Sequence, residues 1–398
     1  MRIALNTTAF IPGKMGGIET YFRKILACLQ KVNTGDDYFL LVDSHYTDEY
    51  LLTSPNFNKV MCNFTEPSLL WFIRGVLRNT LKFDILKPVL NRLPVDIIHH
   101  PFSTLIPPGL KIPSVLTFHD IQHEFFPEFF VGAEMKNRRD FSRRSAIEAT
   151  RIIAISEHVK SSLVDKYQVS PDKIDVVYNG YGHEYQVMDS DRELELVKMK
   201  YALDRPFMYY PAATWPHKNH KKLLEAMRLL SDKYNFDGNL VLTGVAKQSN
   251  NEILGDIDRL RLTDRVKILG YLPYGDIPSL YNLARLLVYP SLFEGFGLPL
   301  VEAMACGCPI VCSNVTAMPE VVKNAALFFT PTSEEDIADK IWSVWNDDSL
   351  RGQLVLKGRE RVKQFQWERS ARETIEVYRK ALVVSASATK ISPKGVGG

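Results

Sequence analysis

The chain has 398 residues, of which 45% are hydrophobic and 24% are charged, and its formal net charge is +3. This length exceeds one ordinary hydrophobic core, so two domains are expected. The composition is that of a soluble globular protein, and the mild charge argues against the dense basic face that nucleic-acid binding needs.

The chain contains five cysteines, which is an odd number. The sequence opens as an apolar strand, MRIALN, without a recognisable secretory signal, so a cytoplasmic protein is expected. Cys306, Cys308 and Cys312 do not have zinc-site spacing, and we interpret them as buried thiols at a helix-to-strand junction. No apolar run is long enough to cross a bilayer.

The first half alternates short apolar strands with helical stretches. Strands are predicted at MRIALN, YFLLVD, DIIHHP, SVLTFHD, RIIAIS and KIDVVYNG. Helices are predicted between them, as in IETYFRKILACLQ and SEHVKSSLVDKY, the second with Ser156 as its N-cap. Continuous apolar strands separated by helices predict a parallel sheet covered on both faces.

Two loops that follow these strands could carry function. Gly16 and Gly17 precede a helix, and glycines at a helix N-terminus let a ligand or an anion approach closely. His119 and Asp120 follow the strand SVLTF. The alternatives for His119 are a metal site with His123, a structural histidine and a ligand contact; no HExxH motif is present.

Two basic stretches also lie in the first half. Arg74, Arg78 and Lys82 fall on one face of a predicted helix in WFIRGVLRNTLKFDILK, and NRRDFSRRS adds four arginines. One interpretation is that both are solvated outer faces of helices that pack on the sheet. The other is a surface for anionic lipid or for a lipid-diphosphate-linked acceptor.

A second series of strands follows the polar segment from Asn179 to Leu203, which we interpret as a hinge. Its strands are FMYYPAA, NLVLTG, RVKILGYL, LLVYPS, PIVCSN and ALFFTP. The predicted fold class is therefore α/β, with two doubly wound, Rossmann-like domains that face each other across a cleft. We expect domains over 1–182 and 186–365, a helix over 366–383 that packs back on the first domain, and a disordered tail over 384–398.

Ligands of such sheets bind beyond the carboxyl ends of the strands. Lys218 follows the first strand of the second half, in TWPHKNHKKLLEA, and could neutralise a diphosphate; the alternative is a solvated lysine at a helix start. Gly244, Tyr271 and Leu272 follow the next two strands. They could form a slot for a nucleobase, or simply turns.

The stretch SLFEGFGLPLVEAMACGCPIV contains a glycine-rich turn that leads into an apolar helix. Gly295 and Gly297 let the backbone approach a ligand, and Pro299 suits the first helical position. The N–H groups of Gly297, Leu298 and Leu300 are expected at the helix N-terminus, where a phosphate binds.

Two carboxylates lie eight residues apart around this turn. Glu302, within the helix, could accept hydrogen bonds from a vicinal diol such as that of a ribose or a sugar. Glu294, in the turn, could accept hydroxyls of a group attached to the phosphate. The alternative is a capped helix with two surface glutamates.

EGFGLPLVE resembles the E-x7-E signature of retaining glycosyltransferases of the GT-B fold, family 4, also called group 1 glycosyltransferases. The resemblance extends from GYLPYGD to TAMPEV. It implies that Glu294 contacts donor-sugar hydroxyls, that Glu302 binds the ribose, and that Gly297 and Leu298 offer N–H groups to the diphosphate. The resemblance also assigns the rest of the turn to donor binding, namely Gly295 and Phe296.

The resemblance includes the first half. GGIET is similar to a family loop that contacts the donor phosphate and the acceptor, which implies such a role for Gly16 and Gly17. Family members carry a histidine near the donor sugar at the position of His119. It also implies that domain closure across the hinge expels water.

The PHKNH segment resembles a family branch linked with polysaccharide synthesis and mannosyl donors. It implies donor contacts for Lys218 and Asn219. The arginine that the family more often has five residues before this lysine is absent, with Ala213 in its place, so another group such as His217 would have to assist. The predicted catalytic residues are His119, Glu294 and Lys218.

The resemblance implies a retaining, metal-independent hexosyltransferase without a cofactor. Its substrates would be a GDP- or UDP-linked sugar of the mannose or glucose type and a glycan or lipid-linked acceptor in cell-surface polysaccharide synthesis. Arg74, Arg78 and Lys82 would give peripheral contact with the inner face of the cytoplasmic membrane.

The alternatives are a catalytically silent glycan- or nucleotide-sugar-binding protein of the same fold and a nucleotide-sugar epimerase. An NAD-dependent enzyme would need GxGxxG after the first strand, where the chain has GKMGGIE. A phosphorylase would need a pyridoxal lysine in the cleft.

Overall fold

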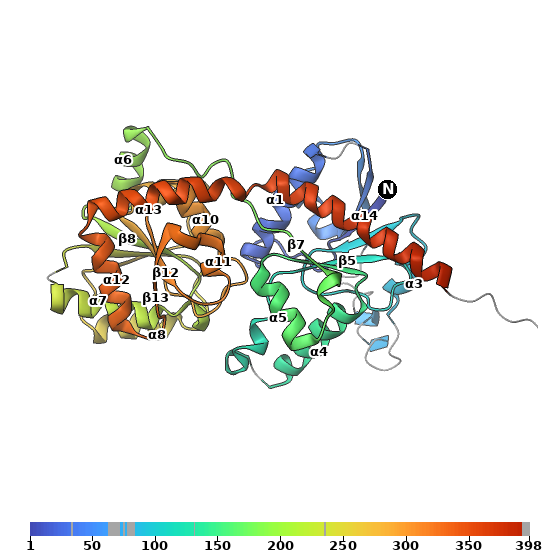
Figure 1. The fold of residues 1–398 in the computed structure, drawn as a ribbon, viewed down its shortest axis with the longest axis horizontal. Coiled ribbons are helices and arrows are strands. Elements are labelled where there is room, and N and C mark those ends of the chain that lie inside the picture. The colour runs from blue at the N-terminus through green and yellow to red at the C-terminus, as the bar shows by residue number, and fades with distance from the viewer. Residues whose placement is uncertain are drawn as a thin grey trace, which may run out of the picture. The chain divides into compact units, whose positions relative to one another are not determined.

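The computed structural model describes residues 1–32, 35–62, 72–74, 76–77, 84–130, 132–234 and 236–391. The chain divides into unit 1, which comprises Met1–Asn179 and Trp367–Gly398, and unit 2, which comprises Gly180–Gln366. Figure 1 shows unit 1 in blue to green with the red helix α14, and unit 2 in yellow-green to orange. Each unit has its own parallel sheet flanked by helices, which confirms the predicted α/β fold class.

In the described part of unit 1, parallel strands form one sheet in the order β3-β2-β1-β4-β5-β6-β7. The strands are β1 Arg2–Asn6, β2 Asp37–Val42, β3 Phe57–Met61, β4 Ile97–His100, β5 Ser114–Phe118, β6 Arg151–Ala154 and β7 Ile174–Val176. The helices are α1 Gly17–Val32, α3 Leu86–Leu90, α4 Gly132–Glu148, α5 Glu157–Tyr167 and α14 Trp367–Ile391. The short helical turns are η1 Ser44–Glu49, η2 Gln122–Glu124, η3 Pro127–Phe129 and η4 Pro171–Lys173.

Two elements of unit 1 differ from the sequence prediction. The prediction omits β3, an edge strand with mostly solvent-exposed residues, because it lacks the apolar run of the other strands. α14 continues to Ile391, so residues 384–391 are helical where a disordered tail is predicted. The sequence VSASATKI contains neither glycine nor proline, so nothing in it ends the helix.

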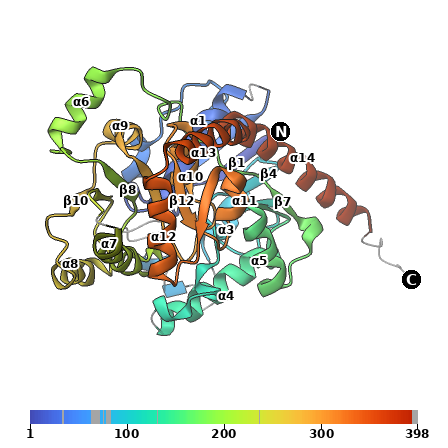
Figure 2. The same cartoon turned by 60° about the vertical axis from the view of Figure 1, so that its left-hand side comes forward.

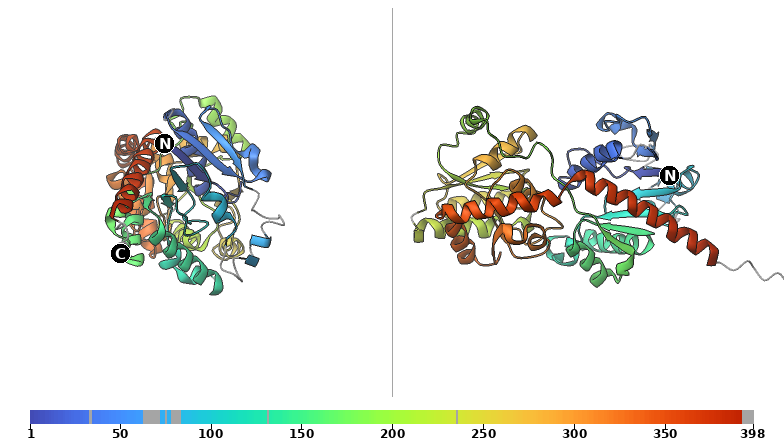
Figure 3. Two further views of the ribbon diagram at one scale, coloured as in Figure 1. Left: turned by 90° about the vertical axis from the view of Figure 1, so that its right-hand side faces the viewer. Right: turned by 45° about the horizontal axis from the view of Figure 1, so that its top comes forward.

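A buried chain of hydrogen bonds fastens α14 to unit 1. The Tyr378 hydroxyl lies 2.7 Å from His99 Nδ1, and His99 Nε2 lies 2.8 Å from Thr117 Oγ1. The same threonine oxygen is 3.1 Å from the Tyr21 hydroxyl of α1. Buried polar groups cost free energy when unpaired, so this chain fixes α14 beside α1, as Figure 3 shows with α14 in red.

In the described part of unit 2, parallel strands form one sheet in the order β10-β9-β8-β11-β12-β13. The strands are β8 Phe207–Pro211, β9 Asn239–Thr243, β10 Val266–Gly270, β11 Leu286–Tyr289, β12 Ile310–Ser313 and β13 Ala326–Phe329. The helices are α6 Asp191–Lys200, α7 His220–Tyr234, α8 Asn250–Arg259, α9 Ile277–Leu283, α10 Leu298–Ala305, α11 Met318–Val322, α12 Glu334–Trp345 and α13 Asp348–Arg361. The short helical turns are η5 Pro216–Lys218, η6 Tyr274–Asp276, η7 Lys323–Ala325 and η8 Val362–Gln364.

The strand order of unit 2 creates a switch point between β8 and β11. These two strands are neighbours, but the chain leaves β8 toward β9 on one side and leaves β11 toward β12 on the other. Figures 1 and 2 show α7, which follows β8, and α10, which follows β11, on opposite faces of the sheet. Open α/β sheets bind ligands beyond the carboxyl ends of the strands at such a point.

The polar segment that we interpret as a hinge contains the helix α6, capped by the Ser190 side chain. α6 packs against α9 and belongs to unit 2. The five cysteines are buried and unpaired, which confirms the interpretation of Cys306, Cys308 and Cys312 as buried thiols. Within the described ranges, no helix combines the length and the apolarity needed to cross a membrane.

Candidate functional site

The loop between β11 and α10 ends at a glycine with a conformation that suits only glycine. Gly297 has φ 94° and ψ 62° and is the N-cap of α10. A Cβ atom at this position would lie 3.0 Å from Leu300 Cδ1, so a side chain would be crowded as well as strained. Pro299 lies in the first turn, as predicted.

Two N–H groups at this helix end donate to no protein group of the described residues, and we call them open. Within the described chain, the N–H groups of Gly297 and Leu298 have no protein acceptor. The Leu300 N–H donates to the Gly297 carbonyl at 3.0 Å, which corrects its prediction as a third open donor. The positive end of the helix dipole adds to the two open N–H groups, so this end of α10 can bind an anion.

A lysine and a glutamate meet beside this helix end. Lys218 Nζ lies 2.5 Å from Glu294 Oε1, and the two side chains are only 15% and 11% exposed. Lys218 follows β8 and Glu294 follows β11, so the pair lies at the switch point of the sheet. The alternatives of a solvated lysine and a surface glutamate are therefore excluded.

The surroundings keep Glu294 ionised. Burial alone would raise its pKa, but the charges of Lys218 and His217 and hydrogen bonds from Lys218 and Ser291 hold the pKa below its usual value. The Glu294 N–H donates to Thr316 Oγ1 at 3.1 Å, which fixes the backbone of the turn. The carboxylate can therefore accept hydroxyl hydrogen bonds at neutral pH.

The turn that carries Lys218 is tied to the end of β11. Asn219 has φ 59°, a left-handed conformation that asparagine tolerates better than most residues. Its Nδ2 donates to the carbonyls of Pro290 at 3.0 Å and Pro331 at 2.8 Å, while the Tyr210 hydroxyl donates to the Lys218 carbonyl at 2.6 Å. These bonds give Asn219 a positioning role, and its predicted donor contact stays a prediction.

Gly244 allows the loops after β8 and β9 to approach each other. A Cβ atom there would lie 2.6 Å from the carbonyl carbon and oxygen of Ala212. The Gly244 N–H donates to the Gly270 carbonyl at 2.8 Å, so it is not an open donor. The loop that carries Ala213, where the family more often has an arginine, is thus packed against the β9 loop.

A cavity of about 280 Å³ opens at the ends of β8, β9 and β10, and its lining includes Gly244 and Tyr271. Tyr271 is 66% exposed, so its ring is accessible to a flat ligand. Leu272 is buried and does not line the cavity. The nucleobase slot therefore stays a prediction for Gly244 and Tyr271, and Leu272 is better explained by packing.

Glu302 lies on α10, the helix whose first N–H groups are open. Its Oε2 accepts a hydrogen bond from the Tyr281 hydroxyl at 2.8 Å. The side chain is partly buried, in contrast to the surface glutamate of the alternative interpretation. Sequence reasoning missed Tyr281, because a tyrosine in an apolar helix has the pattern of a core residue.

In unit 1, Gly16 and Gly17 form the start of α1. Gly16 has φ 54°, and its carbonyl accepts from the Glu19 N–H at 3.0 Å. The Glu19 carboxylate accepts from the Gly13 N–H at 2.8 Å and from Arg23 Nε at 2.9 Å. Glu19 thus closes the glycine loop, which explains the glutamate in GGIET in structural terms.

His119 is buried at the end of β5. Its Nε2 lies 2.8 Å from the Pro101 carbonyl and therefore carries the hydrogen, and its ring meets Tyr21 edge-on at a centroid distance of 4.8 Å. Burial lowers the pKa of His119, so the ring is neutral. The His123 ring bonds instead to the Tyr167 hydroxyl at 2.9 Å, so these two histidines are committed to separate partners.

In the basic stretch WFIRGVLRNTLKFDILK, the Arg74 side chain does not face solvent. Arg74 is buried, and its Nε and Nη2 each lie 2.8 Å from an oxygen of Asp84, which neutralises it. Arg78 and Lys82 lie outside the described residues. On α4, the arginines Arg138, Arg139 and Arg144 are paired with glutamates.

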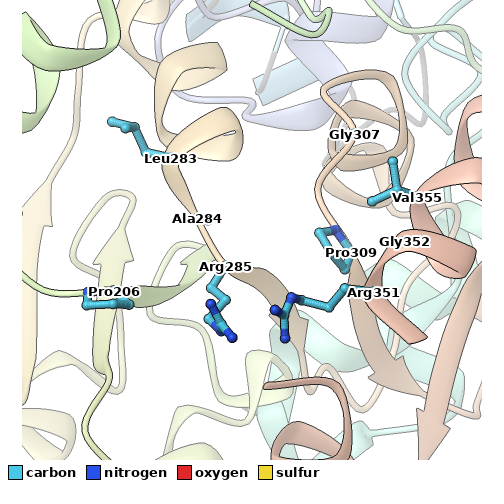
Figure 4. A pocket seen from close by; sticks show the side chains of 9 residues that line it. All are labelled: Pro206, Leu283, Ala284, Arg285, Gly307, Pro309, Arg351, Gly352 and Val355. Carbon is cyan, nitrogen blue, oxygen red and sulfur yellow. The ribbon is translucent and has the colours of Figure 1, made fainter. Parts of the chain in front are cut away.

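A second pocket, of about 470 Å³, lies at the N-terminal ends of the unit 2 strands, before the starts of β8, β11 and β12. Figure 4 shows Arg285 and Arg351 in its wall. Arg285 Nε donates to the Trp345 carbonyl at 3.0 Å, and Arg351 Nη1 donates to the carbonyls of Val344 and Trp345 at 2.8 and 2.6 Å. Both guanidinium groups therefore cap the C-terminal end of α12.

Comparison with known proteins assigns a family to both halves of the chain. Residues 191–361 match the family described as glycosyl transferases group 1, and residues 15–185 match glycosyltransferase family 4. The chain is 33% identical over 285 residues to O-antigen chain mannosyltransferase B of Escherichia coli, a match that covers 71% of this chain and 74% of that protein. It is 27% identical over 335 residues to O-antigen chain mannosyltransferase RfbU of Salmonella typhimurium, covering 81% of this chain and 86% of that protein.

Solved structures share the fold. HepE of Anabaena in complex with UDP and glucose matches with a TM-score of 0.72 at 19% identity, over 96% of this chain and 100% of that one. WaaG, a glycosyltransferase involved in lipopolysaccharide biosynthesis, matches with a TM-score of 0.69 at 15% identity, over 96% of this chain and 99% of that one.

Proposed function

The chain belongs to the group 1, or family 4, glycosyltransferases, and from this membership we propose that it transfers mannose, or a hexose of the same type, from a GDP- or UDP-linked donor. The acceptor is a hydroxyl of a growing, lipid-linked glycan in cell-surface polysaccharide synthesis. The mannosyltransferase relatives of Escherichia coli and Salmonella typhimurium support this choice of sugar and product. HepE, whose structure contains UDP-glucose, supports a nucleotide sugar as the donor.

One observation carries the proposal: two open N–H groups at the start of α10 lie in the same loop-and-helix segment as Glu294 and Glu302. In this assignment the diphosphate binds the N–H groups of Gly297 and Leu298 together with Lys218. Glu302 holds the ribose, and Glu294 accepts hydroxyls of the donor sugar. For His119 and the Gly16–Gly17 loop, both in unit 1, the donor contact that the resemblance implies stays a prediction.

The Lys218–Glu294 pair gives this assignment a definite order of events. Without a ligand, the lysine charge is neutralised by Glu294 at 2.5 Å. An arriving diphosphate competes for Lys218, because it brings more negative charge than one carboxylate. Glu294 then exchanges a lysine partner for sugar hydroxyls, which couples binding of the diphosphate to binding of the correct sugar.

In the proposed reaction, the bond between the anomeric carbon and the phosphate oxygen breaks, and the acceptor oxygen bonds to the anomeric carbon on the same face. The acceptor proton passes to the departing phosphate oxygen, so the anomeric configuration is retained. Lys218 and the α10 N–H groups stabilise the leaving diphosphate most when its charge is greatest. Because these groups supply positive charge, we propose that the transfer needs no metal ion.

A panel of nucleotide sugars tests the proposal. We expect one GDP- or UDP-linked hexose to raise the melting temperature, since a ligand at 100 times its Kd stabilises by about 2.7 kcal/mol. The same donor should release nucleoside diphosphate when a mannosylated acceptor is added, in the presence of a chelator, and NMR should show an unchanged anomeric configuration. Release that stops with the chelator would contradict metal independence. Epimerisation of the donor without an acceptor would contradict the transferase.

A further inference from the structure

The Glu302 carboxylate interacts with two tyrosines. The Tyr281 hydroxyl donates to Oε2 at 2.8 Å. Tyr185 also interacts with this carboxylate, whose negative charge adds to burial in raising the pKa of Tyr185. Tyr281 lies on α9, and Tyr185 lies in the segment that leads to α6, so two separate parts of unit 2 converge on one side chain.

The two tyrosines are themselves fixed by packing. Tyr281 is fully buried, and its ring lies edge-on to Tyr209 at 5.1 Å and to Tyr185 at 6.0 Å between centroids. Asn282, the next residue of α9, accepts from the Met188 N–H and donates to the Gln186 carbonyl, each at 2.9 Å. The backbone beside Tyr185 is therefore pinned to α9.

Both tyrosines keep their protons. Burial raises the pKa of Tyr281, and the negative charge of Glu302 raises it further. The same two causes, in the same order, raise the pKa of Tyr185. The neutral Tyr281 hydroxyl therefore donates to Glu302 across the working pH range.

We propose that Tyr281, assisted by Tyr185, is a positioning residue that aligns the Glu302 carboxylate for the vicinal hydroxyls of a ribose and so selects ribonucleotide donors over deoxyribonucleotides. This inference rests on the proposed function, which gives Glu302 the ribose. A carboxylate that is held in one plane meets both hydroxyls of a ribose without further ordering. When one hydroxyl is absent, an acceptor that the site has aligned stays unpaired, and this penalty discriminates against the deoxy ligand.

The test compares GDP and UDP with their 2′-deoxy forms by calorimetry, in the whole chain and in Tyr281→Phe. Phenylalanine fills the same space and removes only the hydroxyl. We expect the unaltered protein to prefer the ribonucleotide by about tenfold or more, and Tyr281→Phe to reduce that preference to about threefold or less. The KM for the donor should rise in parallel, with kcat changed by less than about twofold, since the tyrosine does not touch the reacting atoms.

Tyr209→Phe is the matched control. Tyr209 belongs to the same buried ring cluster, but its hydroxyl bonds to Thr243 at 2.8 Å. The Tyr209→Phe variant should therefore keep the preference for the ribonucleotide. Tyr185→Phe provides a second arm if Tyr281→Phe does not fold.

The outcomes distinguish a failure of the ribose role of Glu302 from a failure of the positioning role of Tyr281. No preference in the unaltered protein would overturn the ribose role of Glu302 and this inference with it. A preference that Tyr281→Phe and Tyr185→Phe both retain in full would overturn the positioning role alone. A preference lost equally in Tyr209→Phe would show that packing, and not the hydroxyl, is responsible.

Discussion

Lys218→Ala is expected to lower kcat by about 100- to 1,000-fold, the range found when one preorganised charge-stabilising donor is removed. The side chain is 15% exposed and lies beside the open N–H groups of α10, where a departing diphosphate would gather charge. In a site with little water, that charge has few other partners. The measurement is steady-state release of nucleoside diphosphate with the donor that the panel identifies.

Two further variants separate catalysis from folding in this experiment. Removing Lys218 alone leaves Glu294 buried and unpaired, which can cost about 3–5 kcal/mol of stability. The double variant Lys218→Met/Glu294→Gln removes both charges and should fold while remaining inactive. Lys222→Ala, which breaks the more exposed pair of Lys222 with Glu334, should keep normal turnover. Normal turnover in Lys218→Ala would remove this lysine from the diphosphate site.

Glu302→Ala is expected to weaken binding of the nucleoside diphosphate by about 10- to 100-fold, since hydrogen bonds to a charged group contribute about 1.5–3 kcal/mol each. The loss should appear in calorimetry with the nucleotide alone, because the ribose contact does not depend on the sugar. Glu334→Ala, another glutamate of unit 2, is the control. Equal affinity of Glu302→Ala and the unaltered protein would show that the ribose lies elsewhere.

The fold is readable from the sequence where strands are apolar on both faces. β8, β9, β11, β12 and most strands of unit 1 are such strands, because helices cover both sides of each sheet. The apolar pattern does not predict β3, because an edge strand can expose polar residues. The apolar pattern does not predict the end of α14, because helix formation there depends on the lack of a helix-breaking residue and not on an apolar stripe.

The candidate site can be predicted from the sequence where it depends on local geometry. A glycine before Leu298 and a proline after it predict a helix N-terminus with open N–H groups. The contacts of Asn219 are not readable in this way, because its partners Pro290 and Pro331 lie about 70 and 110 positions away. An asparagine in place of a family glycine does signal a left-handed residue, and that signal could have predicted its positioning role.

The contacts of the tyrosine cluster could not be predicted from the sequence either. Tyr185, Tyr209 and Tyr281 come from three separate segments, and each has the sequence context of a core residue. Only the fold reveals that the Tyr281 hydroxyl meets Glu302 while the Tyr209 hydroxyl meets Thr243. Polar roles of buried aromatic residues are set by tertiary contacts, which no local pattern encodes.

A crystal structure with a bound nucleoside diphosphate tests the central claim most directly. We predict phosphate oxygens at about 2.7–3.1 Å from the amide nitrogens of Gly297 and Leu298, with Lys218 turned from Glu294 toward the diphosphate and the ribose on Glu302. A nucleotide bound elsewhere, such as in the pocket of Figure 4, with the Lys218–Glu294 pair intact, would contradict the account.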